Sequence, residues 1–451
     1  MSDIIAAIAT GRAPCAIGIL RLSGPGCAAL TGRVFTPKQP FADAPDRRLV
    51  LGLLHDRQGR VIDECLGVVC RAPHSYTGEE TVELQCHGSP AMLAAGLEAL
   101  LAAGARQAGP GEFTRRAFLN GKLDLTQAEA VVDLIDAETA DAAANAAGQL
   151  GGALKRAIEP VYDGLTDLCS HFHAVLDYPD EDIEDFGAAE LSGALDRAGV
   201  ALRELLATYE KGRHLRQGVR AVLLGKPNAG KSSLLNRLAG YDRVIVTDIA
   251  GTTRDTVEEP VRVGRVLLRL TDTAGIREAG DAIEALGVAR SEQAAREAEL
   301  ALFVCDASQP LTDEDRRAIE AAKCAPRSLA LCNKSDLPAA VSPDELPFDT
   351  VLTVSARTGA GLDALPALVE GWFLGENACD GSLLTNPRQF GALDRASRAI
   401  ERAKTGLGLG VTPDAVLTDV EEAMAALGEV TGRTVREDIT NRIFERFCVG
   451  K

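Results

Sequence analysis

The sequence predicts a multidomain α/β protein in which a domain built on a mostly parallel sheet interrupts a helical domain. Its 451 residues exceed what one ordinary hydrophobic core organises, so two or three domains are expected. In the middle of the chain, short apolar runs are each followed by a polar motif, whereas stretches with helical spacing lie on both sides of them. The apolar runs are residues 219–224, 266–270, 329–332 and 350–354.

The N-terminal segment, residues 1–118, predicts a small α/β domain. It alternates β-rich runs, such as residues 16–22 and 66–70, with one helical pattern at residues 89–103. No catalytic motif is evident in this segment from the residues alone.

Two helical segments flank the central sheet. The acidic residues 177–182 interrupt the first, and the helical pattern resumes near Ala188. We expect the two segments to pack together as one domain, with the tail near the central helices. The runs with helical spacing are 125–151, 154–176, 388–404 and 416–427. The predicted domain segments are 1–118, 119–212, 216–375 and 380–451.

Residues 225–233 match G-x-x-x-x-G-K-[ST], the phosphate-binding P-loop. A predicted buried strand precedes them and a helical stretch, residues 231–238, follows, which is the context this loop requires. Glycines let backbone N–H groups turn inward around phosphates. Lys231 brings a charge to the β- and γ-phosphates, and the Ser232 hydroxyl can ligate Mg²⁺. A glycine-rich turn without a ligand is the alternative, and it does not account for the motifs downstream.

Three further motifs, each after a predicted strand, indicate a guanine nucleotide. Asp272 can hold the Mg²⁺ shell and Gly275 can offer its N–H to a γ-phosphate. Asp336 can accept hydrogen bonds from the N1–H and the exocyclic amine of guanine, a pair that adenine lacks. The backbone at Ala356 can meet the guanine O6, so the ligand lies at the carboxyl ends of the strands. The residues of these motifs and of the P-loop that we expect to bind the nucleotide are Asn228, Ala229, Gly230, Lys231, Ser232, Ser233, Asp272, Thr273, Ala274, Gly275, Asn333, Lys334, Asp336, Ser355, Ala356 and Arg357.

The position after the Asp-x-x-Gly turn, where many small GTPases carry a glutamine that orients water, holds Ile276. Another polar group must therefore orient the water. Acidic candidates follow at Glu278, Asp281 and Glu284. A threonine of the loop 241–255 can complete the Mg²⁺ shell, and carbonyl groups near the P-loop could hold a monovalent cation that supplies positive charge.

Composition narrows the functional classes. Charged residues at 25% and hydrophobic residues at 46% are typical of a soluble globular protein, and without an apolar run of spanning length or a signal pattern we expect a cytoplasmic location. A formal charge of −17 argues against broad electrostatic binding of nucleic acid, so RNA contacts require local basic patches. The 11 cysteines are scattered without a Cys-x-x-Cys pair and indicate neither a zinc knuckle nor a disulfide framework.

Several segments together resemble one protein family. They are residues 75–79, 110–122, 225–233, 247–255, 272–275 and the tail 442–451 with its terminal Phe-Cys-Val-Gly-Lys. The P-loop is shared with many GTPases and the tail motif is the most specific of these segments. The chain resembles, over its whole length, the MnmE (TrmE) family of tRNA-modification GTPases.

The resemblance implies a GTP-hydrolysing enzyme that modifies the wobble uridine of certain tRNAs at C5. It implies a homodimer and a flavin-containing partner, MnmG, in a heterotetramer-type complex. A tetrahydrofolate derivative would supply the methylene bridge, and glycine or ammonium would supply the amine of the carboxymethylaminomethyl or aminomethyl group. The implied architecture is a folate-binding-like N-terminal α/β domain that dimerises, followed by a helical domain that a Ras-like P-loop GTPase domain interrupts.

The same resemblance assigns further residues of the GTPase domain. It implies that Ser232 and Thr253 hold Mg²⁺ and that Glu284 orients the water. It also implies that K⁺ brings the GTPase domains of the dimer together. The implied K⁺ ligands are Asn228, Thr247, Ile249 and Thr252. The implied nucleotide contacts of the loop are Thr247, Asp248, Ile249, Ala250, Gly251, Thr252 and Thr253.

In the N-terminal domain and the tail, the resemblance assigns folate contacts and one thiol. The folate contacts are Arg21, Glu83, Lys122 and Lys451, with Glu79 or Glu80 as alternatives to Glu83. Cys448 corresponds to a cysteine implicated in the modification chemistry, although a lone cysteine is by default an inert thiol. Departures from the family pattern at residues 12–16 and 87–89 leave fewer glycines and affect the expected loop geometry.

Two other functional classes remain open from the sequence. A ribosome-assembly GTPase shares the P-loop and the Asn-Lys-x-Asp motif, but would be expected to carry an RNA-binding module in place of this N-terminal segment. A folate-binding scaffold whose GTPase domain only switches its shape would bind nucleotide tightly with negligible hydrolysis.

Overall fold

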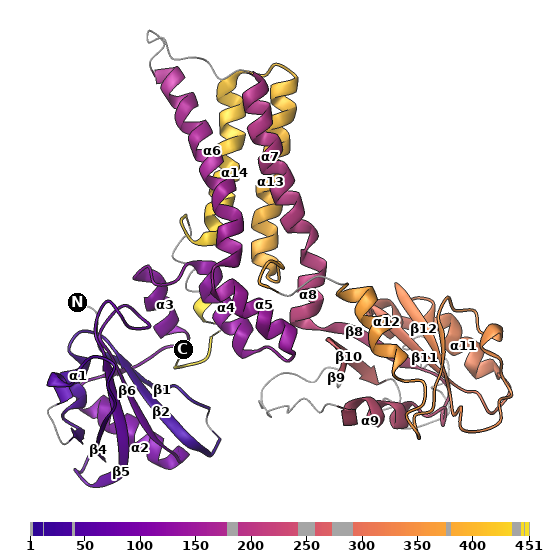
Figure 1. Ribbon diagram of the computed structural model, residues 1–451, viewed down its shortest axis with the longest axis horizontal. Helices are drawn as coiled ribbons and strands as arrows, with labels where there is room; N and C mark the ends of the chain where they lie inside the picture. The colour runs from indigo at the N-terminus through magenta and orange to yellow at the C-terminus, as the bar shows by residue number, and fades with distance from the viewer. Residues whose placement is uncertain are drawn as a thin grey trace. The chain divides into compact units, whose positions relative to one another are not determined.

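A computed structural model describes most of the chain, and Figure 1 labels many of its elements. The described residues are 3–11, 13–37, 41–177, 188–241, 258–272, 292–375, 380–434, 443–445 and 447–450. They form two compact units, one made of residues 1–132, 149–198 and 395–451 and the other of residues 133–148 and 199–394. No helix among the described residues combines the length and the apolar character needed to cross a bilayer.

The N-terminal residues of the first unit form a seven-stranded sheet, several strands of which are labelled in Figure 1. In spatial order its strands are β3 (Phe35–Pro37), β4 (Val50–His55), β5 (Val61–Cys70), β6 (Thr81–Gly88), β2 (Cys15–Ser23), β1 (Ile5–Ile8) and β7 (Arg106–Gln107). All neighbours are antiparallel except β1 and β7. Helix α2 (Pro90–Ala102) packs against Leu20 and other fully buried residues of one face. Gly96 permits the close approach, because a Cβ there would lie 2.8 Å from Leu20 Cδ1.

Helices before and after the second unit's sheet pack together within the first unit. The Cys169 thiol of α6 (Ala153–Asp177) donates to the Met424 sulfur of α14 (Pro413–Thr431) at 3.5 Å. Lys404 of α13 (Pro387–Gly408) pairs with Asp196 of α7 (Ala188–Ala207). These four helices run side by side in Figure 1, so the predicted pairing of the two helical segments is observed. Smaller helices of the N-terminal part are α1 (Cys27–Thr31), η1 (Phe41–Asp43) and α3 (Glu112–Leu119).

The predicted helical run 125–151 is divided into α4 (Leu125–Ile135) and α5 (Ala140–Leu150). The physical reason lies at Thr139, whose Oγ1 accepts a hydrogen bond from the Ala142 amide at 3.1 Å. This contact is typical of a helix N-cap, because it satisfies an amide that has no partner inside the helix. Threonine at this position therefore starts a new helix where the alanine-rich composition suggested continuity.

The second unit contains a six-stranded sheet. In spatial order its strands are β13 (Val351–Thr353), β12 (Arg327–Asn333), β11 (Leu300–Asp306), β8 (Val219–Leu224), β10 (Val266–Asp272) and β9 (Glu258–Val263). Only β9 runs antiparallel to its neighbour. The helices of this unit include α8 (Tyr209–Gln217), α9 (Lys231–Tyr241), α11 (Asp313–Ala322) and α12 (Ala364–Phe373). The 3-10 turn η3 (Pro343–Glu345) precedes β13.

Both faces of this second sheet are covered by packed side chains. Leu223, Leu302 and Leu331 belong to one apolar cluster, while Phe303 and Ala330 belong to another. Neighbouring residues of one strand thus enter different clusters, as expected for a parallel sheet covered on both faces. Strand β11 is buried at all seven positions and was not identified from the sequence.

The carboxyl ends of the parallel strands β8, β10, β11, β12 and β13 lie at one edge of this sheet. The observed architecture is a mixed α/β domain, a helical bundle, and a mostly parallel-sheet domain whose sequence is inserted between the two halves of the bundle sequence. The predicted fold class is therefore confirmed.

Candidate nucleotide site and N-terminal polar site

The P-loop connects the carboxyl end of β8 to the start of α9. Gly225 and Gly230 have φ angles of +145° and +99°, and Asn228 between them has φ +62°. A Cβ at Gly225 would lie 2.1 Å from the Val304 carbonyl oxygen. Because side chains rarely adopt such φ values and none fits beside Val304, glycine is required at the first motif position.

Lys231 begins α9 and its side chain folds back over the loop. Its Nζ donates to the carbonyl oxygens of Gly225 at 2.6 Å and Lys226 at 2.8 Å, and the residue is only 8% exposed. The ammonium group is thus held among backbone groups, where it can meet an anion bound by the loop. Ser232 and Ser233 follow in the first turn of α9 and both are exposed, whereas Ala229 is buried.

Asn333, at the end of β12, joins two loops of the site. Its Nδ2 donates to the Ala229 carbonyl oxygen at 2.9 Å, and its Oδ1 accepts from the Ala356 amide at 2.9 Å. The side chain is 2% exposed, so both bonds are shielded from water. Asn333 therefore fixes the P-loop relative to the loop after β13.

Asp336 lies beside the loop that follows β13. The Ser355 hydroxyl donates to Asp336 Oδ1 at 2.6 Å, and a guanidinium nitrogen of the exposed Arg357 lies 3.6 Å from Oδ2. The hydrogen bond from Ser355 lowers the pKa of Asp336 below its ordinary value. The carboxylate is therefore ionised near neutral pH and presents acceptor oxygens.

Two lysines near the P-loop are paired with carboxylates. Lys334 has φ +67° and its Nζ donates to Asp306 Oδ2 at 2.7 Å, while Lys226 Nζ donates to the fully buried Asp315 at 2.8 Å. Burial opposes ionisation of Asp306, but hydrogen bonds led by that from Lys334 lower its pKa. A hollow of 440 Å³ adjoins these pairs. Its lining includes Lys226, Pro227, Asn228, Asp306, Gln309 and Lys334.

Several predicted site residues fall outside what the structure describes. The backbone of Asp272 ends β10 at the same edge as the P-loop, and its side chain is outside the described part. The predicted residues that lie outside the described ranges are Thr247, Asp248, Ile249, Ala250, Gly251, Thr252, Thr253, Thr273, Ala274, Gly275, Glu284 and Lys451.

A second polar arrangement occurs in the N-terminal sheet, where Arg21 of β2 lies opposite Glu83 of β6. Arg21 Nε donates to Glu83 Oε1 at 2.8 Å. The guanidinium carbon lies 5.7 Å from the ring centre of Tyr76 and 5.8 Å from that of Phe113. The structure thus pairs Arg21 with Glu83 and places two aromatic rings near the Arg21 guanidinium. Sequence reasoning assigned no role to these rings, although both belong to the motif segments 75–79 and 110–122.

The tail reaches the same place. The Gly450 carbonyl oxygen accepts from Arg21 at 3.4 Å, and the Gly111 amide donates to the Cys448 carbonyl oxygen at 3.2 Å. Gly450 has φ +103°, and a Cβ there would lie 2.4 Å from the Ile8 carbonyl oxygen. Cys448 itself is exposed.

Phenylalanines anchor this tail. Phe444 and Phe447 are buried in a cluster with Ala128 and Val131 of α4. The sequence expectation that the tail lies near the central helices is thus observed. Lys122 belongs to the same surroundings, because its Nζ donates to the Pro73 carbonyl oxygen at 3.1 Å in the loop that carries Tyr76.

Comparison with known proteins adds two matches to protein-family models, MnmE helical domain over residues 125–448 and GTP-binding protein TrmE N-terminus over residues 4–122. The chain belongs to the MnmE family. Similar curated proteins are each described as tRNA modification GTPase MnmE. That of Roseiflexus sp. (strain RS-1) is 45% identical, with 100% of this chain and 99% of that protein covered. Those of Chloroflexus aurantiacus and Aquifex aeolicus are 43% and 41% identical, with 100% of both chains covered in each case. The family identified from the motifs is therefore confirmed.

With the MnmE family established, the carboxylates near Arg21 can be told apart by their partners. Glu83 pairs with Arg21, whereas Glu79 pairs with Arg116 at 2.9 Å and Glu80 with Arg71 at 3.3 Å. Of the three alternatives left open by the sequence, the structure has Glu83 beside Arg21.

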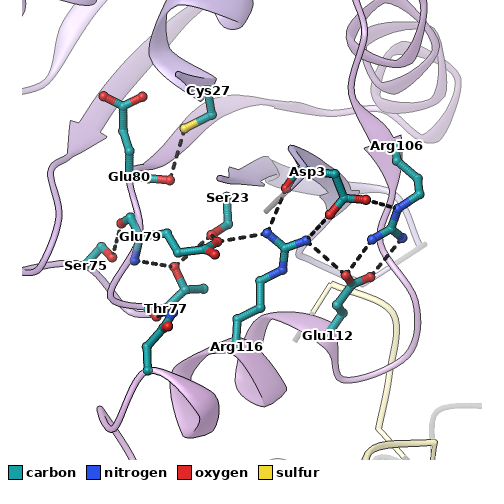
Figure 2. Close-up of polar contacts among 11 residues, drawn as sticks. Asp3, Ser23, Cys27, Ser75, Thr77, Glu79, Glu80, Arg106, Glu112 and Arg116 are labelled. Carbon is teal, nitrogen blue, oxygen red and sulfur yellow. Dashed lines mark hydrogen bonds and ion pairs between the residues drawn. The ribbon is translucent and has the colours of Figure 1, made fainter. Parts of the chain in front are cut away.

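Sequence reasoning also missed a charge network centred on the buried Arg116, which Figure 2 shows. The Arg116 guanidinium donates to Glu79 Oε2 at 2.9 Å, to Asp3 Oδ1 at 2.7 Å and to Glu112 Oε1 at 3.2 Å. Arg106 donates to the same Asp3 and Glu112 carboxylates at 2.6 and 2.7 Å. The hydrogen bond from Arg106, aided by that from Arg116, lowers the pKa of Asp3 to about 2. The network fixes the loop before β6 to α3, next to the aromatic rings around Arg21.

Proposed function

We propose that this chain binds and hydrolyses GTP and takes part in modification of the wobble uridine of certain tRNAs. Binding of GTP is supported above all by the two hydrogen bonds of Asn333, which link the P-loop to the loop beside Asp336. Phosphate-binding and base-binding elements are thereby joined at one sheet edge, as a nucleotide requires. The tRNA part is supported by membership in the MnmE family and by relatives named as tRNA modification GTPases.

In this proposal Lys231 neutralises the β- and γ-phosphates and the backbone of residues 228–233 surrounds them. Asp336 accepts hydrogen bonds from guanine N1–H and the exocyclic amine. The loop containing Ser355, Ala356 and Arg357 meets the other edge of the base.

Asp336→Asn tests the assignment of the base. An amide would still accept from N1–H but would present a donor where guanine also donates. Xanthine carries a carbonyl oxygen there, so the variant should lose affinity for GTP and gain affinity for xanthosine triphosphate. Arg357→Lys, at the exposed neighbour, is the matched control and should retain guanine preference. Unchanged preference in Asp336→Asn would contradict the proposed base contact.

The residues present fit a Mg²⁺ ion, because Ser232 offers an exposed hydroxyl at the start of α9. Ser232, Thr253 and Asp272 would hold it, and the ion would neutralise charge on the β- and γ-phosphates. The K⁺ proposal rests on family membership, with Asn228, Thr247, Ile249 and Thr252 as ligands. Glu284 would orient the attacking water, since Ile276 cannot.

Turnover of GTP by the full chain in KCl and in NaCl at equal ionic strength tests this part. Light scattering with GDP and aluminium fluoride would follow association of the GTPase domains of the proposed dimer. We expect faster turnover and association only with K⁺. Glu284→Ala should retain GTP binding and lose turnover, whereas Glu278→Ala should retain both. Equal rates in the two salts would contradict the cation role, and normal turnover of Glu284→Ala would contradict the assignment of the water.

The residues around Arg21 fit a tetrahydrofolate derivative. A guanidinium near two aromatic rings, paired with a carboxylate, offers donors, acceptors and stacking surfaces for a pterin or a glutamate group. Arg21, Glu83, Lys122 and Lys451 would hold it, and bound folate would supply the one-carbon unit.

Arg21→Lys should weaken folate binding about tenfold or more, because a bidentate donor is lost while the charge is kept. Arg60→Lys, at an exposed position of the same domain, is the control. Equal folate affinity for Arg21→Lys and the native chain would contradict this assignment.

We propose the domain segments 1–118, 119–212, 216–375 and 380–451 as the sequence predicts them. We also propose that the chain forms a homodimer, works with the flavin-containing partner MnmG, and acts on tRNA in the cytoplasm. Cys448 is proposed to take part in the modification chemistry, supported by its exposure and by the contact of Gly450, two residues further on, with Arg21. In cells that lack the native chain, mass spectrometry of tRNA digests should detect restoration of the modified uridine by the native sequence. Lys231→Ala should not restore the modified uridine. If the native sequence also failed to restore it, the proposed tRNA function would be contradicted.

A further inference from the structure

Three metal-binding donors converge in the N-terminal sheet, outside the sites described above. The Asp63 carboxylate and the Cys65 thiol belong to β5, and the Cys86 thiol belongs to the neighbouring strand β6. One carboxylate oxygen and the two sulfur atoms all lie within 4.8 Å of one another. The strand register explains the meeting: Leu66 pairs with Gln85, so Cys65 and Cys86 are the next residues to face each other.

The Asp63 carboxylate is held toward the thiols from the other side by His87. The His87 backbone amide donates to Asp63 Oδ2 at 2.8 Å, and its Nδ1 lies 2.7 Å from Oδ1. The Asp63 side chain is 8% exposed, while the His87 side chain is 79% exposed. Carboxylates that ligate metals are commonly held by such outer hydrogen bonds, which set their orientation.

We propose that Asp63, Cys65 and Cys86 bind a divalent ion of the zinc type, with water in the fourth position. A tetrahedral zinc ion with Zn–S bonds of about 2.3 Å separates two sulfur atoms by about 3.8 Å. The three donor atoms, which all lie within 4.8 Å of one another, are close enough to bind one such ion. Two thiolates favour Zn²⁺ or Co²⁺ over Mg²⁺ and Ca²⁺, which prefer oxygen ligands only.

Binding releases protons. Each thiol loses its proton to solvent when its sulfur bonds to the metal ion, and no oxidant or reductant is needed. The affinity for the ion therefore rises with pH.

This site lies on the opposite face of the sheet from the Arg21–Glu83 pair. Cys86 belongs to the same apolar cluster as Leu20, Leu84 and Leu93, which pack beneath α2. Side chains alternate along a strand, so Glu83 points away from the face of Leu84 and Cys86. A bound ion would therefore fasten β5 to β6 without touching the proposed folate pocket, and the inference does not depend on the GTPase or folate proposals.

Titration of the full, reduced and chelator-stripped chain with Co²⁺ alone tests the site. A sulfur-bound tetrahedral cobalt ion gives thiolate charge-transfer absorption and strong ligand-field bands, whereas oxygen-bound cobalt gives only weak bands. We expect one cobalt per chain, displaced by one equivalent of Zn²⁺. Cys65→Ser and Cys86→Ser should each remove the charge-transfer absorption. Cys70→Ser, at a half-buried thiol of the same strand, should retain it.

His87→Ala should weaken cobalt binding about 10- to 100-fold by releasing the carboxylate. A measurement without substitutions guards against misfolded variants: alkylation of the native chain with and without Zn²⁺, followed by peptide mapping. Cys65 and Cys86 should be protected by zinc, whereas the exposed Cys15 should react equally in both samples. Absence of thiolate absorption at one equivalent, its survival in Cys86→Ser, or equal alkylation of Cys86 with and without zinc would overturn the proposal.

Discussion

Replacement of Asn333 by alanine should loosen the connection between the two loops of the nucleotide site. The change removes a donor to the Ala229 carbonyl oxygen and an acceptor from the Ala356 amide. Both backbone groups belong to buried residues, at 0% and 7% exposure. Leaving a buried group without its partner costs about 1–2 kcal/mol, so the two losses together destabilise the closed arrangement by about 2–4 kcal/mol. At about 1.4 kcal/mol per tenfold, the open population rises about 30- to 700-fold.

Amide hydrogen exchange of the full chain without nucleotide, read by mass spectrometry on peptides containing Ala356, measures that population. Asn333→Asp keeps the acceptor for Ala356 but sets a buried carboxylate oxygen against the Ala229 carbonyl oxygen, so its exchange should be at least as fast as that of Asn333→Ala. Lys334→Ala is the matched control, since the Lys334 side chain bonds to Asp306 and not to the backbone groups that Asn333 binds. Exchange in Asn333→Ala within about threefold of the native rate would refute the reasoning.

Three further predictions concern stability and binding. Burial opposes ionisation of Glu299, but hydrogen bonds led by that from His214 lower its pKa from 4.5 to about 2. The ionised Glu299 therefore stabilises the folded chain above pH 4.5, and this stabilisation is lost as the pH falls toward 2. Glu299→Gln should therefore flatten the acid limb of urea midpoints measured against pH, and an unchanged slope would contradict the assignment. Gly225→Ala should abolish nucleotide binding in a fluorescent GDP titration, because its Cβ would meet the Val304 carbonyl oxygen at 2.1 Å; near-native affinity would contradict this clash. Phe444→Ala should destabilise the packing of the tail by about 3–5 kcal/mol. Limited proteolysis should then cleave the tail of this variant faster than the tail of Phe348→Ala, a control in which the lost ring stacks on Phe303 of the P-loop domain.

Local motifs allowed the nucleotide site to be predicted in detail. The strand at 219–224 and the start of α9 agree with the sequence expectation, because apolar runs and the glycine pattern are properties of adjacent residues. The roles of Lys231 and Asp336 follow from the same short segments and remain predictions. The central strand β11 could not be identified in this way, because no nucleotide-binding motif follows Asp306 at its end.

Contacts between distant segments could not be predicted from composition or spacing. Cys65 and Cys86 are 21 positions apart (86 minus 65) in the sequence and carry no metal-binding spacing, yet strand register brings their sulfur atoms together. Arg116 likewise reads as an ordinary surface charge in its helix, and only the fold brings Asp3 and Glu79 to it. Such meetings depend on topology, which the local sequence does not encode.

The contact between Arg21 and Gly450 has a consequence for synthesis of the chain, because these residues are 429 positions apart. At roughly 5–20 residues per second, translation separates their appearance by about 20–90 seconds. During that interval the nascent N-terminal domain exists without Val449 as the partner of Pro110 and without the phenylalanines that anchor the tail. A product that stops before residue 443 would carry every described strand of the P-loop domain but would lack the tail contacts with Arg21 and Pro110. Early termination of translation would thus release chains in which the P-loop domain has its full sequence while the N-terminal domain lacks its tail contacts.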